Sequence, residues 1–212
     1  MNSNQNSTED NLRGNSDTIG FNLNISAQIL PAFFQFLGQG FRIETLTGCS
    51  LEEIICQQLD IDPDYFQNRV ETIFLNGKPV DDPASASVAD GSSITLSAAM
   101  PGLAGAMMRK GGILSSMRST ISHNEDETST CAARGKITLK LFNLIGRELG
   151  PKFLQKGILI NGNDLNDFLK RQGKIFWKGV NSAGINDNKM PITQIKDLDW
   201  SGKEILLQIS VD

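Results

Sequence analysis

The sequence predicts an α+β protein, and three kinds of local pattern support this fold class. Several short runs alternate apolar and polar residues, which is typical of strands with one buried face. A capping-box motif between two of these runs marks the start of a helix. The pairs Asn76-Gly77 and Asn161-Gly162 each follow an apolar run and favour tight turns. With 212 residues, of which 39% are hydrophobic, the chain can form one large domain or two small ones.

The first part of the chain contains the patterns of four strands. We expect a disordered tail over residues 1–19, because this segment is rich in Asn and Ser and has almost nothing to bury. Residues 29–40 are expected to form a short apolar helix or a buried loop, with Pro31 in a first helical turn. The alternating or apolar runs predict strands at 21–25, 41–46, 70–75 and 94–98.

The clearest helix signal lies between the second and third of these strands. Ser50 precedes Glu53 by three residues, so that each side chain can bond to the backbone N–H of the other. We therefore expect a helix over residues 51–59, ended by the Asp and Pro residues of 60–63. Its apolar residues recur at helical spacing and predict a buried stripe, which consists of Leu51, Ile54, Ile55 and Leu59.

The order strand, strand, helix, strand, strand is that of a β-grasp (ubiquitin-like) domain, in which a mixed sheet packs on one helix. Residues 70–82 and 88–102 also resemble the second half of ubiquitin-like sulfur carriers, namely the small subunit of molybdopterin synthase and the thiamine sulfur carrier. The matching positions are Asn76 and Gly77, then Asp90 and Gly91 before the strand at 94–98. The resemblance covers about residues 40–112 and implies a β-grasp domain, which we place at 20–112.

The same resemblance implies a function for the diglycine at the end of this region. The carriers end at a Gly-Gly whose carboxylate is adenylated and then thiolated. Here Gly111-Gly112 is followed by 100 further residues, so a role as sulfur carrier or protein modifier requires cleavage after Gly112. The segment 99–112 also resembles one in uncharacterised bacterial proteins, which adds no function.

The second part of the chain predicts a smaller α/β domain at 136–212, after a polar linker at 113–135. A helix at 142–150 is expected to end or kink at Gly150-Pro151, and residues 181–191 are expected to form a loop. Further strands are expected at 136–141, 158–160, 174–177 and 204–211, with a short helix at 164–170. Residues 136–150 resemble the opening of the molybdopterin-synthase small subunit, and 158–167 echo 74–82, so this domain could be a degenerate β-grasp repeat.

Charge is distributed unevenly between the two parts. Residues 1–133 carry 7 Lys and Arg against 16 Asp and Glu, whereas residues 134–212 carry 13 against 8. Two explanations are open. The difference is a chance one between two solvated surfaces, or it reflects attraction of the basic part to the acidic part or to an acidic partner. There is no dense basic patch of the kind that binds nucleic acid.

Cysteine usage and hydropathy give an expected location. The three cysteines include no Cys-x-x-Cys pair, no secretory leader is evident at the N-terminus, and no apolar run has the length of a membrane span. We therefore expect a soluble cytoplasmic protein with reduced thiols, in which Cys49 is a turn residue and Cys56 belongs to the core. No membrane partner is expected, and the oligomeric state is open.

Catalytic residues, metal ligands and cofactor sites are not predicted. The one histidine, His123, lies in the expected linker, the cysteines lack ligand spacing, and phosphate-loop motifs are absent. We expect a non-enzymatic interaction or scaffold protein with an unidentified protein partner; the alternatives are the carrier precursor described above and an enzyme with an unfamiliar site. The candidate functional stretch consists of Met100, Pro101, Gly102, Gly105, Arg109, Lys110, Gly111 and Gly112. A packing role for its apolar residues is the competing interpretation.

Overall fold

One mixed sheet extends through the protein. The computed structural model describes residues 18–114, 131 and 133–212, and in these residues ten strands form the order β4-β3-β5-β6-β2-β7-β10-β1-β8-β9. The strands are β1 (Thr18–Ile25), β2 (Phe41–Thr47), β3 (Thr72–Leu75), β4 (Lys78–Pro79), β5 (Ser93–Ser97), β6 (Ala133–Phe142), β7 (Ile158–Asn161), β8 (Val180–Ile185), β9 (Asn188–Met190) and β10 (Glu204–Val211). The helices are η1 (Ala27–Phe33), α1 (Phe34–Gln39), α2 (Leu51–Glu53), η2 (Ile54–Gln58), α3 (Pro63–Arg69), α4 (Gly102–Met108), α5 (Asn143–Lys156), α6 (Gly162–Lys170), α7 (Lys174–Lys178) and α8 (Ile192–Ile195).

The helix predicted from the capping box forms as expected. The Glu53 N–H donates to Ser50 Oγ at 3.2 Å, and the Ser50 N–H donates to Glu53 Oε2 at 3.0 Å. The helix continues from α2 into the π-helical turn η2, where the Leu59 N–H donates to the Ile54 carbonyl at 2.9 Å. All four residues of the predicted stripe are buried, so local sequence and tertiary packing agree here.

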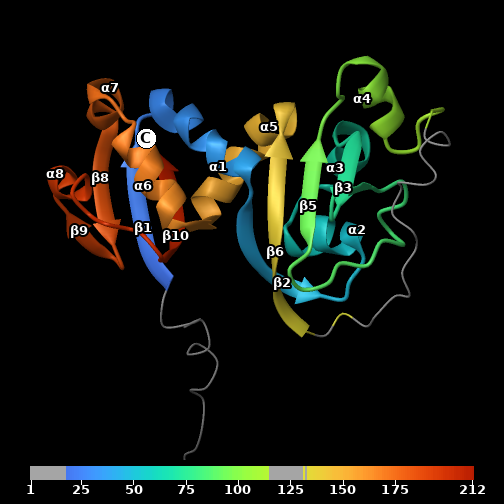
Figure 1. The fold of residues 1–212 in the computed structure, drawn as a ribbon, viewed down its shortest axis with the longest axis horizontal. Coiled ribbons are helices and arrows are strands. Elements are labelled where there is room, and N and C mark those ends of the chain that lie inside the picture. Colours follow the sequence, from blue (N-terminus) through green and yellow to red (C-terminus); the bar gives the residue numbers. More distant parts are fainter. Residues whose placement is uncertain (1–17, 115–130, 132) are drawn as a thin grey trace, which may run out of the picture.

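Strands that are distant in sequence lie side by side in two places (Figure 1). Strand β6 lies between β5, to which it is parallel, and β2, to which it is antiparallel. Strand β1 pairs in parallel with β10 and antiparallel with β8. The predicted ranges 20–112 and 136–212 therefore exchange strands within one sheet, and the layout in two domains is not confirmed.

The central strands bury one face and leave the other accessible. Phe41 and Ile43 of β2 lie opposite Leu139 and Ile137 of β6, and these side chains point to the same side of the sheet. The helix α5 packs on this side, because the Phe153 ring lies 5.4 Å from the ring of Phe41. The intervening residues point to the other side, where those of β2 and β6 are exposed or half-buried.

An aromatic cluster fills the core beside β1. The centre of the Phe168 ring on α6 lies 5.0 Å from the ring centre of Phe33, 5.1 Å from that of Phe36 and 5.4 Å from that of Phe176. These rings come from η1, α1, α6 and α7, so the cluster joins four helical segments. Elsewhere in this core, Trp200 packs on Phe21 of β1, and their ring centres are 4.8 Å apart. The core is therefore continuous from β1 to the last helices.

Three predictions for the second part of the chain are wrong. Of the two outcomes expected at Gly150-Pro151, the end of the helix is wrong, because the buried Phe153 and Leu154 keep α5 packed on the sheet as far as Lys156. Gly150 packs closely on Leu37, whose Cδ1 is 2.4 Å from the position of an added Cβ. The expected strand at 174–177 is helix α7, whose Phe176 belongs to the aromatic cluster. The expected loop at 181–191 forms the hairpin β8-β9.

The remaining expectations fall into two groups. The mixed helix and strand content is confirmed. The predicted strands at 21–25, 41–46, 70–75, 94–98, 136–141, 158–160 and 204–211 and the helix at 164–170 are also confirmed, with ends that shift by a few residues. A β-grasp domain and its repeat stay predictions. Of the predicted tail at 1–19, residues 1–17 lie outside the described residues, as does His123, whereas Thr18 and Ile19 belong to β1. Of the helices in the described part of the chain, none is long and apolar enough to cross a membrane.

Candidate functional site

Basic side chains gather on the accessible face of the sheet. Along β6, Arg134, Lys136 and Lys140 alternate with the buried Ile137, Leu139 and Leu141, and so they point away from the core. Arg42 of β2 lies opposite Thr138 of β6 and joins them on the same face. We call Arg42, Arg134, Lys136 and Lys140 the basic stripe.

Two carboxylates partly neutralise this stripe. Glu204 at the start of β10 lies 2.8 Å from both Arg42 Nη2 and Lys136 Nζ. Burial would raise the pKa of Glu204, but the bond from Lys136 and the charge of Arg42 outweigh it, so the pKa is lowered. Glu44 lies 4.0 Å from Lys136. Four cations against two carboxylates leave this face net positive, and within the described residues Arg134 and Lys140 have no ion-pair partner.

Apolar side chains flank the basic stripe on the same face. Leu46 follows Arg42 and Glu44 by alternation along β2 and is 44% exposed. Phe142 follows Lys140 by alternation along β6 and is 41% exposed. Charged groups beside large exposed apolar side chains are a combination typical of protein-binding surfaces.

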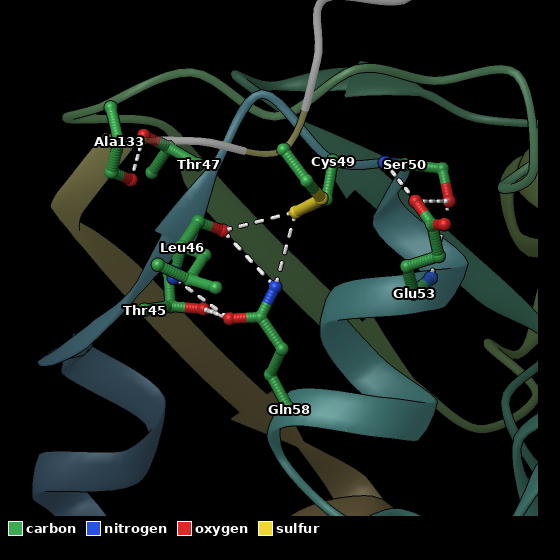
Figure 2. Close-up of a disulfide and its surroundings, with 9 residues drawn as sticks. Thr45, Leu46, Thr47, Cys49, Ser50, Glu53, Gln58 and Ala133 are labelled. Atoms are coloured by element: carbon green, nitrogen blue, oxygen red, sulfur yellow. Dashed lines mark hydrogen bonds between the residues drawn. A yellow bond between two sulfur atoms is a disulfide. The ribbon is translucent and has the colours of Figure 1, made fainter.

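Among the described residues, no strand lies beside β2 at Leu46 on the side away from β6, and a side chain covers this edge instead. The register of β2 with β7 includes only the pair Arg42 and Leu159. Beyond this point, the Leu46 N–H donates to Gln58 Oε1 at 2.7 Å, and Gln58 Nε2 donates to the Leu46 carbonyl at 3.1 Å (Figure 2). The amide of Gln58 thus replaces a neighbouring strand. A surface hollow of about 560 Å³ lies here, lined by Glu44, Thr45, Leu46, Gln58, Arg134, Gly135 and Lys136.

The Gln58→Ala variant is expected to lose about 1 kcal/mol of folding free energy, because Leu46 and the Thr45 hydroxyl lose the oxygen that accepts from them. Water replaces part of this bonding at a half-buried site, which keeps the loss small. The exposed Gln57 on the same helix provides the control, and Gln57→Ala should leave stability within about 0.5 kcal/mol of wild type. Urea unfolding of both variants measures the difference, and equal midpoints would show that Gln58 does not hold this edge.

A disulfide joins the β2–α2 turn to the start of β6. It links Cys49 to Cys131, which are 82 residues apart in sequence, and Gln58 Nε2 donates to Cys49 Sγ at 3.2 Å (Figure 2). The expectation of reduced thiols is therefore wrong for this pair. We expected Cys56 in the core and Cys49 in a turn, but Cys49 is buried, whereas Cys56 is half-buried and has a free thiol.

The first half of the predicted functional stretch forms a small helix above the end of β5. Pro101 precedes the first turn of α4, and Gly102 takes a φ of 78° that favours glycine. Gly105 is a close-packing position, because an added Cβ would lie 2.0 Å from the Met100 carbonyl oxygen. The competing interpretation is that Met100, Leu103, Met107 and Met108 pack on the first sheet. It is wrong for Met100 and Leu103, which are exposed, Leu103 to 71%, whereas Met107 and Met108 are half-buried.

An ion pair and hydrogen bonds hold the second half of the stretch against the segment around β3. Arg109 forms an ion pair with Glu71, whose carbonyl accepts from the Lys110 N–H at 2.7 Å. The Gly111 N–H donates to Asp81 Oδ1 at 3.1 Å, and the Gly112 N–H donates to the Arg109 carbonyl at 3.2 Å. Gly111 is exposed with a φ of 60°, and Gly112 is half-buried. The diglycine is therefore a turn in an anchored segment.

Lys110 has an unusual environment within this segment. Its Nζ lies 5.1 Å from the centre of the Phe66 ring and is buried with no hydrogen-bond acceptor among the described residues. Burial lowers the pKa of Lys110, whereas the charges of Glu52 and Cys56 act in the opposite direction. The ammonium thus contributes to the packing of the stretch on α3 rather than to a solvated surface.

Sequence reasoning missed the basic stripe and the disulfide. The alternation in 134–141 was visible and predicts a basic strand face, but only the pairing of β6 with β2 adds Arg42 to it. The disulfide gives no local signal, because its two cysteines meet only through the same pairing.

Comparisons with known proteins found no matching family model, no matching curated protein and no matching solved structure. The resemblance to sulfur carriers therefore stays a prediction.

Proposed function

We propose that this protein is a non-enzymatic binding module, which uses the basic stripe and its apolar flanks to bind an acidic segment of a partner protein. The observation that carries the proposal is the alignment of four basic side chains on one face of β2 and β6, where Arg134 is exposed and Arg42, Lys136 and Lys140 are half-buried, with the exposed Leu46 and Phe142 on the same face. Carboxylates of a partner would pair with Arg134 and Lys140, while its apolar residues would cover Leu46 and Phe142.

A ubiquitin-like architecture around this surface is part of the proposal. Strand β6 includes the residues that resemble the opening of a sulfur carrier, and it lies parallel to β5 and beside β2. We infer that β6 serves as the first strand of a β-grasp unit whose other elements, β2, α2–η2, β3, β4 and β5, precede it in sequence. The helix would cover one face of this unit, and the basic stripe would occupy the other.

Photo-crosslinking in native host cells tests the function. A photoreactive amino acid at Lys140 is expected to crosslink a protein through an acidic contact peptide, and the Arg134→Glu substitution should remove that product. The matched control carries the same amino acid at Ile175, which is 83% exposed on α7 and far along the chain from the stripe. The same products from both positions, or a nucleic-acid product from position 140, would contradict the proposal.

The carrier precursor is the second candidate, because the peptide bond after Gly112 is accessible. Ile113, on the far side of this bond, is 97% exposed. The β6 strand lies beyond the bond, however, and pairs with both β2 and β5. A cleaved chain would therefore present its diglycine carboxylate on a protein made of two pieces.

Cleavage at an engineered protease site between Gly112 and Ile113 is expected to leave the two pieces associated. With the disulfide reduced, they should still elute together on native size exclusion, because β6 supplies the strand between β2 and β5. On denaturing gels they should separate only after reduction, because Cys49 and Cys131 lie in different pieces. Release of a free 1–112 piece under native, reducing conditions would contradict the strand pairing and favour a separable carrier.

A further inference from the structure

Three potential metal ligands meet where β2 turns into α2. Ligand atoms of Cys49, Glu53 and Cys131 all lie within 4.8 Å of one another. Spacing in the sequence gives no such indication, because Cys131 comes 82 residues after Cys49. The pairing of Thr47 with Ala133 at the ends of β2 and β6 brings the two cysteines together.

The surroundings fix two of the three ligands. Cys49 is buried, and its sulfur accepts from Gln58 Nε2. Glu53 is oriented by its capping bonds, and both the N–H and the Oγ of Ser50 donate to Oε2 at 3.0 Å (Figure 2). Cys131 is exposed and precedes the start of β6, so its side chain has room to adjust.

Two thiolates and a carboxylate form a ligand set that suits a thiophilic divalent cation. Zn²⁺ binds thiolate sulfur at about 2.3 Å and carboxylate oxygen at about 2.0 to 2.2 Å in tetrahedral geometry. Two sulfurs in such a site are about 3.7 Å apart, so the sulfurs that are bonded to each other in the oxidised protein must separate on reduction, and the exposed Cys131 can move to allow this. Three protein ligands leave the fourth position for water.

We propose that the reduced protein binds one Zn²⁺-like cation through Cys49, Glu53 and Cys131, so that the metal replaces the disulfide as the link between α2 and β6. A dithiol reductant converts the disulfide to two thiols and is itself oxidised to a disulfide. Metal binding then releases the two thiol protons and forms two metal–sulfur bonds and one metal–oxygen bond. The oxidised protein has no thiolate at this site and should not bind the cation.

Cobalt titration of the reduced full-length chain in the absence of oxygen tests the site. We expect one Co²⁺ per chain, a near-ultraviolet band from thiolate ligation, and loss of this band when Zn²⁺ is added. Cys131→Ser should weaken Co²⁺ binding by at least about tenfold, and Glu53→Gln should weaken it while keeping the capping box. Cys56→Ser is the matched control, because the half-buried Cys56 lies outside the cluster.

Two results would overturn the proposal. One is a reduced wild-type protein without the thiolate band, with circular dichroism showing that it is folded. The other is an equal effect of Cys131→Ser and Cys56→Ser on cobalt affinity. Because the reference protein is already reduced, loss of the disulfide in Cys131→Ser does not affect the comparison.

Discussion

The Cys131→Ser variant is expected to unfold with a free energy about 4.5 kcal/mol below that of the oxidised wild-type protein. The disulfide closes a loop of 82 residues in the unfolded chain, and the chain entropy removed by such a crosslink sets this magnitude. The loop includes β3, β4, β5 and the predicted functional stretch. Chemical unfolding monitored by circular dichroism measures the loss.

Two comparisons separate the crosslink from other effects of the substitution. Reduced wild-type protein should match the Cys131→Ser variant in metal-free buffer, because both lack the disulfide. The Cys56→Ser variant should keep the full difference between its oxidised and reduced forms, since Cys56 is not crosslinked. If oxidised and reduced wild-type protein unfold at the same denaturant concentration, the disulfide does not stabilise the fold as expected here.

Phe168→Ala is expected to lower the free energy of unfolding by about 3 to 5 kcal/mol, because it removes a fully buried ring and leaves a cavity at the centre of the aromatic cluster. Three other rings, those of Phe33, Phe36 and Phe176, lie within 5.4 Å of it, centre to centre. They belong to different helical segments, so the cavity cannot close by a shift of one of them alone. Thermal unfolding followed by calorimetry gives the change.

The matched control removes another phenylalanine ring, which lies on the accessible face of the sheet. Phe142→Ala should change stability by about 1 kcal/mol or less, because this ring is 41% exposed at the end of β6. Comparable losses for Phe142→Ala and Phe168→Ala would show that the aromatic cluster is not the main support of this part of the core.

Local signals predicted elements whose sequence and packing agree. The capping box predicted the start of α2, and the run at 136–141 predicted the strand β6. The hairpin β8-β9 was missed, although Asn186 and Asp187 at its turn are a usable signal. Both residues take positive φ, a conformation that Asn and Asp tolerate well. The helix α5 was cut short because a proline removes one N–H, a loss that tertiary packing outweighs here.

Long-range pairing is what the sequence could not provide. Nothing in residues 18–25 indicates a parallel partner at 204–211, and nothing in β5 indicates that the strand beside it comes after the linker. The candidate site depends on this pairing, because Arg42 joins the basic stripe and Cys131 reaches Cys49 only through the register of β2 with β6. The predicted stretch at Met100 to Gly112 was found by its composition, whereas its anchoring by Glu71 and Asp81 was not visible.

The affinity of the crosslinked partner for two charge variants tests the central claim most directly. Lys140→Glu reverses a charge within the basic stripe, and Lys189→Glu makes the same change at an exposed lysine on β9. We expect Lys140→Glu to weaken binding by about tenfold or more, with an effect that decreases at high salt, and Lys189→Glu to leave it within about twofold. Equal affinities of the two variants would contradict binding through the accessible face of β2 and β6.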